Sequence, residues 1–125
     1  MTMTIYKLRN DKKSNANQKD SNLTLLLDIS GTFGNSGIWT IQNDILTISG
    51  QETVGPCNDL ESCPYKEYSD SVISIIIEND ATTLSNNVFN DFTLLQSVTL
   101  PESIMYIGNS AFNNSQNLQN LQYLK

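Results

Sequence analysis

Hydrophobic and polar positions repeat with a fixed period over the second half of the chain. Residues 74–96 align with residues 97–119 without a gap, at a constant offset that carries Ser74 onto Ser97, and a partial third copy follows at 120–125. Apolar positions match in kind, polar Asn, Ser and Gln positions recur, and Phe89 falls on Phe112. The pattern predicts a chain built from stacked copies of one unit.

Each copy contains a short strand of alternating residues, at 74–77 and 97–100. A period of two places Ile75 and Val98 on the inward side of adjacent strands. Periods of about 20–29 residues with Leu or Ile at fixed offsets are typical of leucine-rich-repeat solenoids. Over residues 71–125 we therefore predict a repeat solenoid of about two and a half units, with a parallel β ladder and returning arms that are irregular, 3-10 or short helical.

The outward positions of these strands form the candidate binding face. Neighbouring strands of a parallel ladder lie about 4.8 Å apart, so outward residues of successive repeats line up. Hydroxyls and amides predominate, together with one Ile, and such a surface suits polar contact with a protein or a glycan. The expected members are Ser74, Ile76, Ser97, Thr99, Asn120 and Gln122.

The returning arms are rich in Asn, which suits tight turns because its amide bonds local backbone and tolerates left-handed conformations. These residues are Asn86, Asn87, Asn90, Asn109, Asn113 and Asn114. Gly108 is expected to meet the same conformational need. We also expect the Phe89 and Phe112 rings to stack in register, and full burial of one such side chain is worth about 1.5–3 kcal/mol.

The first part of the chain predicts a cap over the start of the solenoid. Two runs rich in β-branched residues flank Asn43 and Asp44, a pattern that predicts a β-hairpin over residues 38–50. This hairpin carries Trp39 and needs a surface on which to pack, because an isolated hairpin is marginally stable. Together with the irregular loop that follows it, the hairpin forms an expected cap over residues 23–70.

Residues 1–22 hold few apolar side chains, so we expect a mobile tail that buries too little surface to offset its ordering entropy. A short strand around Ile5, Tyr6 and Leu8 is the alternative within this segment. Most basic residues also lie here, as is usual for a solvated tail: Lys7, Arg9, Lys12, Lys13 and Lys19.

The charge balance narrows the range of partners. The net charge is −6, from 7 Lys and Arg against 13 Asp and Glu. This argues against nucleic acid and against an anionic membrane surface, because both reward clustered basic side chains. The apolar run at 25–27 is far too short to span a membrane, and no secretory signal is visible. From the residues alone we expect no membrane insertion and a cytoplasmic location.

Cys57 and Cys63 are the only cysteines, and they lie close together in the chain. Two free thiols in a loop are the simpler expectation, and a local disulfide, formed in an oxidising compartment, is the alternative. The chain has no His, so a zinc site would need two carboxylates beside the thiols. That ligand set is unusual for structural zinc, and no metal site is predicted.

The residues of common catalytic chemistry are missing from the sequence. Without His, and without a Gly-x-Ser-x-Gly motif, His-based triads and His-activated cysteine nucleophiles are excluded. No P-loop or Gly-x-Gly-x-x-Gly motif occurs, so no cofactor is expected. Carboxylate pairs exist at Glu78/Asp80 and Asp59/Glu61, but in an acidic chain such pairs are usually solvated surface. We predict that the protein is not an enzyme.

Residues 97–112, SVTLPESIMYIGNSAF, resemble the repeat of the BspA-like (Treponema pallidum-type) leucine-rich-repeat family. That repeat runs Leu-x-x-Val-x-Ile-Pro-x-x-Val-x-x-Ile-Gly-x-x-Ala-Phe, and the matching residues are Leu95, Val98, Leu100, Pro101, Ile104, Ile107, Gly108, Ala111 and Phe112. The preceding repeat is looser, with Glu78, Ser85 and Val88 in the Pro, Gly and Ala slots. The segment before the first repeat also resembles the family, at Gly31, Thr32, Gly34, Trp39, Thr40, Ile41, Leu46, Thr47, Ile48, Ser49 and Gly50.

The resemblance covers residues 31–125 and implies a non-enzymatic surface or adhesion-type protein. Members of that family bind host matrix or other proteins through the solenoid, so the implied compartment is the cell surface. We predict a protein-interaction module of this type. The alternative is a truncated repeat protein whose main property is self-association: the strand LQYL (121–124) has no polar cap beyond it, and its edge invites pairing with a second copy.

Overall fold

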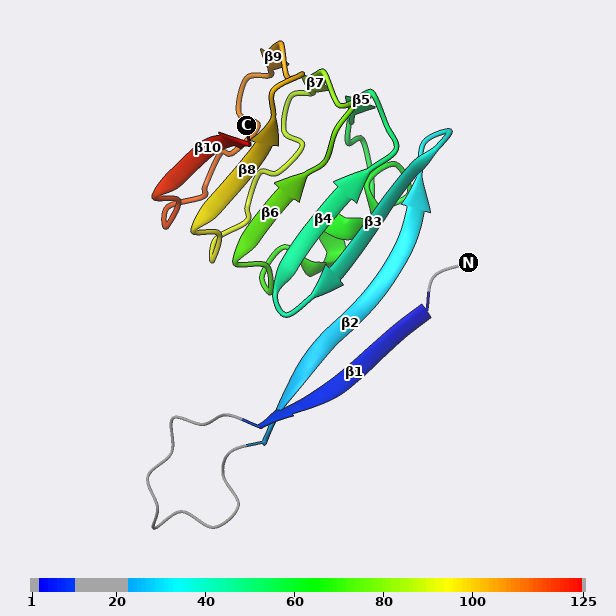
Figure 1. Ribbon diagram of the computed structural model, residues 1–125, viewed down its shortest axis with the longest axis vertical. Helices are drawn as coiled ribbons and strands as arrows, with labels where there is room; N and C mark the ends of the chain where they lie inside the picture. Colours follow the sequence, from blue (N-terminus) through cyan, green and yellow to red (C-terminus); the bar gives the residue numbers. More distant parts are fainter. Residues whose placement is uncertain (1–2, 11–22, 125) are drawn as a thin grey trace.

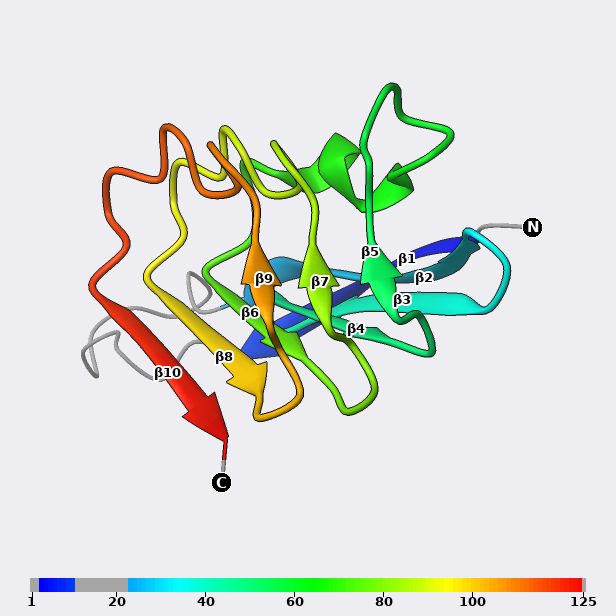
Figure 2. The same ribbon diagram turned by 90° about the horizontal axis from the view of Figure 1, so that it is seen from above.

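A computed structural model describes residues 3–10 and 23–124 and arranges them in two sheets (Figures 1 and 2). The larger sheet has the strand order β1-β2-β3-β4-β6-β8-β10, and the smaller has the order β5-β7-β9. The elements are β1 (Met3–Asn10), β2 (Leu23–Phe33), β3 (Gly37–Gln42), β4 (Ile45–Ser49), β5 (Thr53–Val54), the 3-10 helix η1 (Pro64–Tyr68), β6 (Ser74–Ile77), β7 (Thr83–Leu84), β8 (Ser97–Pro101), β9 (Tyr106–Ile107) and β10 (Asn120–Leu124).

The repeats stack as parallel strands in the register that the sequence predicts. Ile75 of β6 lies opposite Val98 of β8, and Val98 lies opposite Leu121 of β10. In the returning arms β7 pairs with β9 in parallel, with Leu84 opposite Ile107. The predicted strand-rich repeat fold is therefore confirmed, with irregular arms that consist of these short strands and turns.

The stack begins earlier than the sequence pattern indicates. Strand β4 pairs with β6 in parallel, with Leu46 opposite Ile75, and β5 pairs with β7, with Val54 opposite Leu84. Residues 45–73 thus form one more turn of the coil. This turn is longer than the next one, and the extra length holds the loop that carries η1. The added loop conceals the turn from a search for an exact repeat period.

The predicted hairpin is confirmed and is also part of the main sheet. Strands β3 and β4 pair antiparallel, with Trp39 opposite Ile48. Asn43 and Asp44 in the connection both have positive φ, at 53° and 66°. Two positive-φ residues are what a tight hairpin turn of this kind requires, and Asn and Asp tolerate that conformation better than most residues.

The expectation of a mobile tail over residues 1–22 is wrong for Met3–Asn10, and the alternative, a short strand around Ile5, Tyr6 and Leu8, is confirmed. This segment is strand β1, paired antiparallel with β2 over its whole length, from Met3 opposite Ser30 to Asn10 opposite Leu23. Composition does not reveal the strand because the edge of β2 offers backbone hydrogen bonds whatever the side chains are. Residues 11–22 lie outside the described part of the chain.

The core lies between the two sheets and consists of the inward residues of successive turns. At its N-terminal end the indole of Trp39 is 1% exposed and packs over Gly31. A Cβ at Gly31 would lie 2.8 Å from the indole nitrogen, so glycine is required by this close approach. The rings of Phe89 and Phe112 are stacked, with centroids 5.6 Å apart, as the repeat offset predicts.

Left-handed residues recur along the arms with the period of the repeat. Asn87 and Ser110 have positive φ, as do Asp91 and Asn114, and the members of each pair occupy equivalent positions in successive repeats. The expectation that Gly108 supplies a left-handed conformation is wrong, because Gly108 does not have a positive φ. A Cβ there would lie 2.5 Å from the backbone nitrogen of Asn86, so the glycine allows two arms to approach closely.

Candidate functional site

The six outward residues expected from the sequence lie together on one face of the larger sheet. The strand pairing aligns Ser74, Ser97 and Asn120 in one row. It aligns Ile76, Thr99 and Gln122 in a second row. The strand residues between them, such as Ile75 and Val98, are buried, so the alternation of inward and outward positions holds on each strand.

Both rows continue onto strands that the sequence assigned to the cap. The first row gains Asp28, Gln42 and Ile45, and the second gains Ser30, Thr40 and Thr47. We call the two complete rows the outer ladder: Asp28, Gln42, Ile45, Ser74, Ser97 and Asn120, with Ser30, Thr40, Thr47, Ile76, Thr99 and Gln122. Sequence reasoning missed the added residues, although the alternation in ILTIS (45–49) is the same as in SIII (74–77).

Hydrogen bonds between side chains of neighbouring strands order the outer ladder. The hydroxyls of Ser74 and Ser97 lie 2.9 Å apart. The amide of Gln122 donates to the Thr99 hydroxyl at 3.4 Å. Asp28 is the only charged residue in the two rows. The two rows are therefore mostly polar and almost uncharged, although the chain as a whole is acidic.

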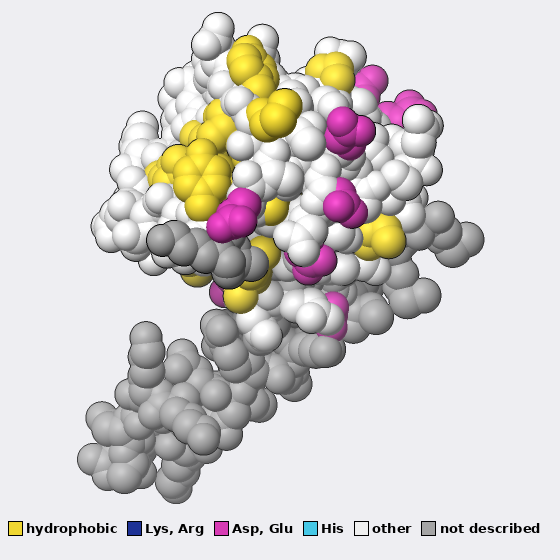
Figure 3. All heavy atoms as spheres, turned by 45° about the horizontal axis from the view of Figure 1, so that its top comes forward, with side chains coloured by type: hydrophobic (Ala, Val, Ile, Leu, Met, Phe, Trp, Pro, Cys, Tyr) yellow, Lys and Arg dark blue, Asp and Glu magenta, His cyan; other side chains and the backbone are white. Residues whose placement is uncertain are grey.

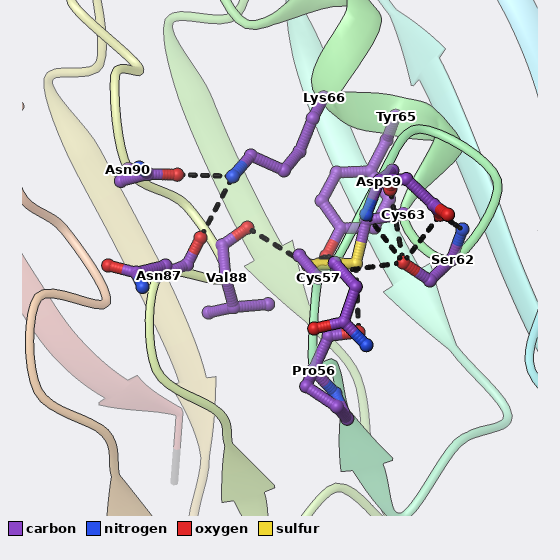
Figure 4. The surroundings of a disulfide bond; sticks show 11 residues. Pro56, Cys57, Asp59, Ser62, Cys63, Tyr65, Lys66, Asn87, Val88 and Asn90 are labelled. Carbon is purple, nitrogen blue, oxygen red and sulfur yellow. Dashed lines mark hydrogen bonds between the residues drawn. A yellow bond between two sulfur atoms is a disulfide. The ribbon is translucent and has the colours of Figure 1, made fainter.

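Cys57 and Cys63 form a disulfide, with their Cα atoms 5.3 Å apart, so the expectation of two free thiols is wrong (Figure 4). The bond closes the loop that precedes η1. The Tyr65 hydroxyl lies 3.3 Å from the Cys63 sulfur and 3.6 Å from the Cys57 sulfur. Since oxidised sulfurs carry no proton, the tyrosine is the donor. Tyr65 is fully buried, and this burial raises the pKa of its hydroxyl.

Lys66 ties the disulfide loop to the arm of the next turn. Its ammonium donates to the carbonyl oxygen of Asn87 at 3.0 Å and to the side-chain oxygen of Asn90 (Figure 4). Partial burial lowers the pKa of Lys66, and the nearby charge of Asp91 opposes that change.

Within the loop, Ser62 donates its backbone N–H to the Asp59 carboxylate at 2.9 Å. Hydrogen bonds from the backbone and the side chain of Ser62 lower the pKa of Asp59. We call the disulfide loop and the residues that hold it the clasp: Cys57, Asp59, Ser62, Cys63, Tyr65 and Lys66.

The outermost turn of the described chain exposes apolar side chains. Leu121 and Tyr123 of β10 are 48% and 51% exposed, Tyr106 of β9 is 54% exposed and Met105 beside it is 84% exposed. We call these four residues the open end. Figure 3 shows hydrophobic side chains gathered at the end of the molecule that carries β9 and β10. No described strand pairs with the outer edge of β10.

The two carboxylate pairs lie apart from each other. Asp59 and Glu61 are in the disulfide loop, while Glu78 and Asp80 line a groove after β6. Neither pair has a thiol or imidazole available beside it, since both cysteines are oxidised and the chain has no His. Among the described residues no group of three or more His, Cys, Asp or Glu is placed to hold a metal ion.

In-register parallel strands with turn-rich returning arms are typical of leucine-rich-repeat proteins. Residues 64–125 match a family described as "BspA type Leucine rich repeat region (6 copies)". The match covers the repeats that resemble this family in sequence, and it supports that resemblance. No curated protein matches the chain.

The chain is similar in structure to a leucine-rich repeat protein from Eubacterium ventriosum, with a TM-score of 0.69 at 20% sequence identity. That match covers 78% of this chain and 26% of the other, so the chain spans about a quarter of its neighbour's length. The pneumococcal vaccine antigen PcpA matches with a TM-score of 0.33 at 14% identity, over 74% of this chain and 38% of that chain. The first similarity shows the fold. In the described segments, no helix has the length and apolar character to cross a membrane.

Proposed function

We propose that the chain is a non-enzymatic protein-interaction module that binds a protein partner through the outer ladder. The family match over residues 64–125 suggests an interaction repeat module in general. The observation that carries the proposal is the continuous ladder across six strands, β2, β3, β4, β6, β8 and β10. A face of hydroxyls and amides suits a wet, polar protein interface. A glycan is the less favoured partner, because no aromatic side chain lies in the two rows to stack on a sugar ring.

The experiment places one charge on the ladder and compares it with the same charge elsewhere. Thr99→Arg puts a long side chain in the middle of the face, and Gln116→Arg makes the same change in charge on an exposed position of a returning arm. Binding to immobilised extracellular-matrix extract is measured for both variants and for the unchanged protein. We expect Thr99→Arg to weaken binding by about tenfold, or about 1.4 kcal/mol, and Gln116→Arg to bind normally. Equal binding by all three proteins would contradict the proposal.

Self-association through the open end is a second candidate, favoured by its exposed apolar residues. A parallel sheet edge has unpaired backbone groups that can accept a second copy. Sedimentation of the chain at rising concentration tests it, with Leu121→Lys as the variant that should remain monomeric. Gln122→Lys, the next residue on the outward side of the same strand, is the matched control. A monomer at every concentration would exclude this candidate.

We further propose a surface-associated or otherwise extracytoplasmic setting, in place of the cytoplasmic one expected from composition. The Cys57–Cys63 disulfide supports it, because disulfides persist in oxidising compartments. Alkylation of the protein as recovered from its native cells, before any reduction, tests this. Labelling of both cysteines would show a reducing compartment and overturn the proposal.

A further inference from the structure

The turns at the carboxyl ends of β4 and β6 enclose a groove of about 440 Å³ at the margin of the outer ladder. Its lining includes Ile76, which belongs to the ladder, and Ile77, whose side chain is buried in the core. Glu78 and Asp80 line the groove in the turn that follows β6. A partly exposed isoleucine, Ile76, and two acidic residues thus occur in one concave site, next to the proposed binding face.

The carboxylates of Glu78 and Asp80 are exposed and unused within the described chain. Neither makes a side-chain hydrogen bond or ion pair with another described residue. Lys66 is the only Lys or Arg between Asp28 and Tyr123, and its ammonium is held on the returning arm by Asn87 and Asn90. Figure 3 shows acidic side chains across the face that carries these turns and no coloured Lys or Arg among them.

The repeat fold itself does not require these two acids. In the next repeat, the positions equivalent to Glu78 and Asp80 are occupied by Pro101 and Ser103. The later turn is built without either carboxylate, so the pair is a local feature of this groove. Asp80 moreover has a φ of 84°, a conformation that non-glycine residues seldom adopt.

We propose that this groove receives a basic side chain, arginine or lysine, of the protein that binds the outer ladder. Its aliphatic stem would lie on Ile76, and its charged head would pair with Glu78 and Asp80. Long basic side chains bury their methylenes on apolar surface while keeping the charge at a polar rim. Hydrogen bonds between a cation and a carboxylate are about twice as strong as those between neutral groups. The inference rests on the proposed function, because it names the chemistry of the same partner.

The test uses a minimal probe, the peptide Ac-Gly-Arg-Gly-NH2, titrated into the full chain and followed by the backbone amide signals in NMR spectra. The matched probe carries citrulline, which has nearly the shape of arginine but no charge. We expect the arginine peptide to shift the signals of Gly50 and Asn79 with millimolar affinity, and the citrulline peptide to leave them unchanged. Glu78→Gln with Asp80→Asn should weaken binding by about tenfold, in line with loss of a charge-assisted contact.

The control variant, Glu61→Gln with Glu67→Gln, removes the same charge from exposed positions outside the groove and should bind the arginine peptide normally. Shifts that persist in Glu78→Gln with Asp80→Asn, equal binding of citrulline, or no shift at all would each overturn the inference. Thr99→Arg separates the two proposals. If Thr99→Arg loses matrix binding but the unchanged protein shows no peptide shift, the groove proposal is wrong and the outer ladder still stands as the binding face. If the peptide binds but matrix binding does not depend on Thr99, the outer ladder is wrong as the binding face.

Discussion

The two ends of the repeat stack are built from the same alternating pattern, but their inward side chains differ in how far neighbouring residues shield them from solvent. At the closed end, which we define by Phe33, Trp39 and Tyr65, each of these side chains is at most 5% exposed. At the open end the inward residues Leu121 and Tyr123 are about half exposed. Burial is therefore a property of neighbouring turns, and an inward position alone does not supply it.

Two structural features shield the closed end from solvent. Strands β2 and β3 continue the sheet beyond the first turn, and Trp39 fills the space over Gly31. The disulfide loop brings Tyr65 between Phe33 and Phe89, with ring centroids 5.8 Å and 5.7 Å apart. An aromatic cluster thus joins the cap to the first full repeat. The stability of the stack is expected to fall from the closed end toward the open end.

Truncation of the stacked phenylalanines tests this gradient and has the largest expected effect. Phe89 is fully buried and contacts Tyr65, Phe92 and Phe112, whereas Phe112 is only partly buried. Phe89→Ala should lower the free energy of unfolding by about 3–5 kcal/mol. Phe112→Ala should cost clearly less, because its ring has solvent on one side. Urea unfolding measures both, and equal losses would show that the two ends are equivalent.

Removal of the disulfide is expected to loosen the closed end by a smaller amount. Opening a loop of this length costs about 2 kcal/mol in the chain-entropy description. The change is Cys57→Ser with Cys63→Ser, and thermal unfolding measures the loss. A reductant should destabilise the unchanged protein to the same extent and have no effect on the double variant. A reductant effect that persists in the variant would place the cause elsewhere.

Alkaline unfolding tests the burial of Tyr65. Because burial raises its pKa above the ordinary value near 10, the folded state keeps the proton while the unfolded state releases it. Stability is then lost as pH rises above about 10, at up to about 1.4 kcal/mol per pH unit. Lys66, whose pKa is lowered, contributes with the opposite sign, so the readout is the difference between the unchanged protein and Tyr65→Phe. Identical slopes for the two proteins would mean that Tyr65 is not buried.

The smallest expected effect concerns Asp59 in the same loop. Its pKa is lowered, first by the backbone N–H of Ser62, so its contribution is present above the ordinary pKa of about 3.9 and is lost as pH falls through the lower folded value. Asp59→Asn should therefore lower the melting temperature slightly at neutral pH and reduce its fall in acid. Glu61→Gln, a neighbouring exposed acid, serves as control and should leave the acid profile unchanged.

The sequence predicts the repeat because identical packing demands recur at identical spacing. Ile75, Val98 and Leu121 lie in one row since each faces the same interior, and this register follows from the alignment. The outward rows follow from the same alternation. The role of the outer ladder and of its residues stays a prediction.

The missed features depend on contacts that are distant in the chain. Strand β4 is a turn of the coil, but Leu46 is further from Ile75 along the chain than Ile75 is from Val98, so no exact period marks it. Strand β1 is only the alternative expectation for its segment, because composition does not encode its pairing with the free edge of β2. The oxidation of Cys57 and Cys63 depends on how the loop folds around Tyr65, and the spacing alone leaves both thiol states open.

The position of Trp39 has a practical consequence for spectroscopy. It is the single tryptophan of the chain, it is enclosed at the closed end, and its ring centroid lies 6.0 Å from that of Tyr68. Its fluorescence therefore monitors the docking of β3 and the clasp but is blind to fraying of β10. A second chromophore placed near Leu121 would let the two halves of the coil be watched separately as they melt.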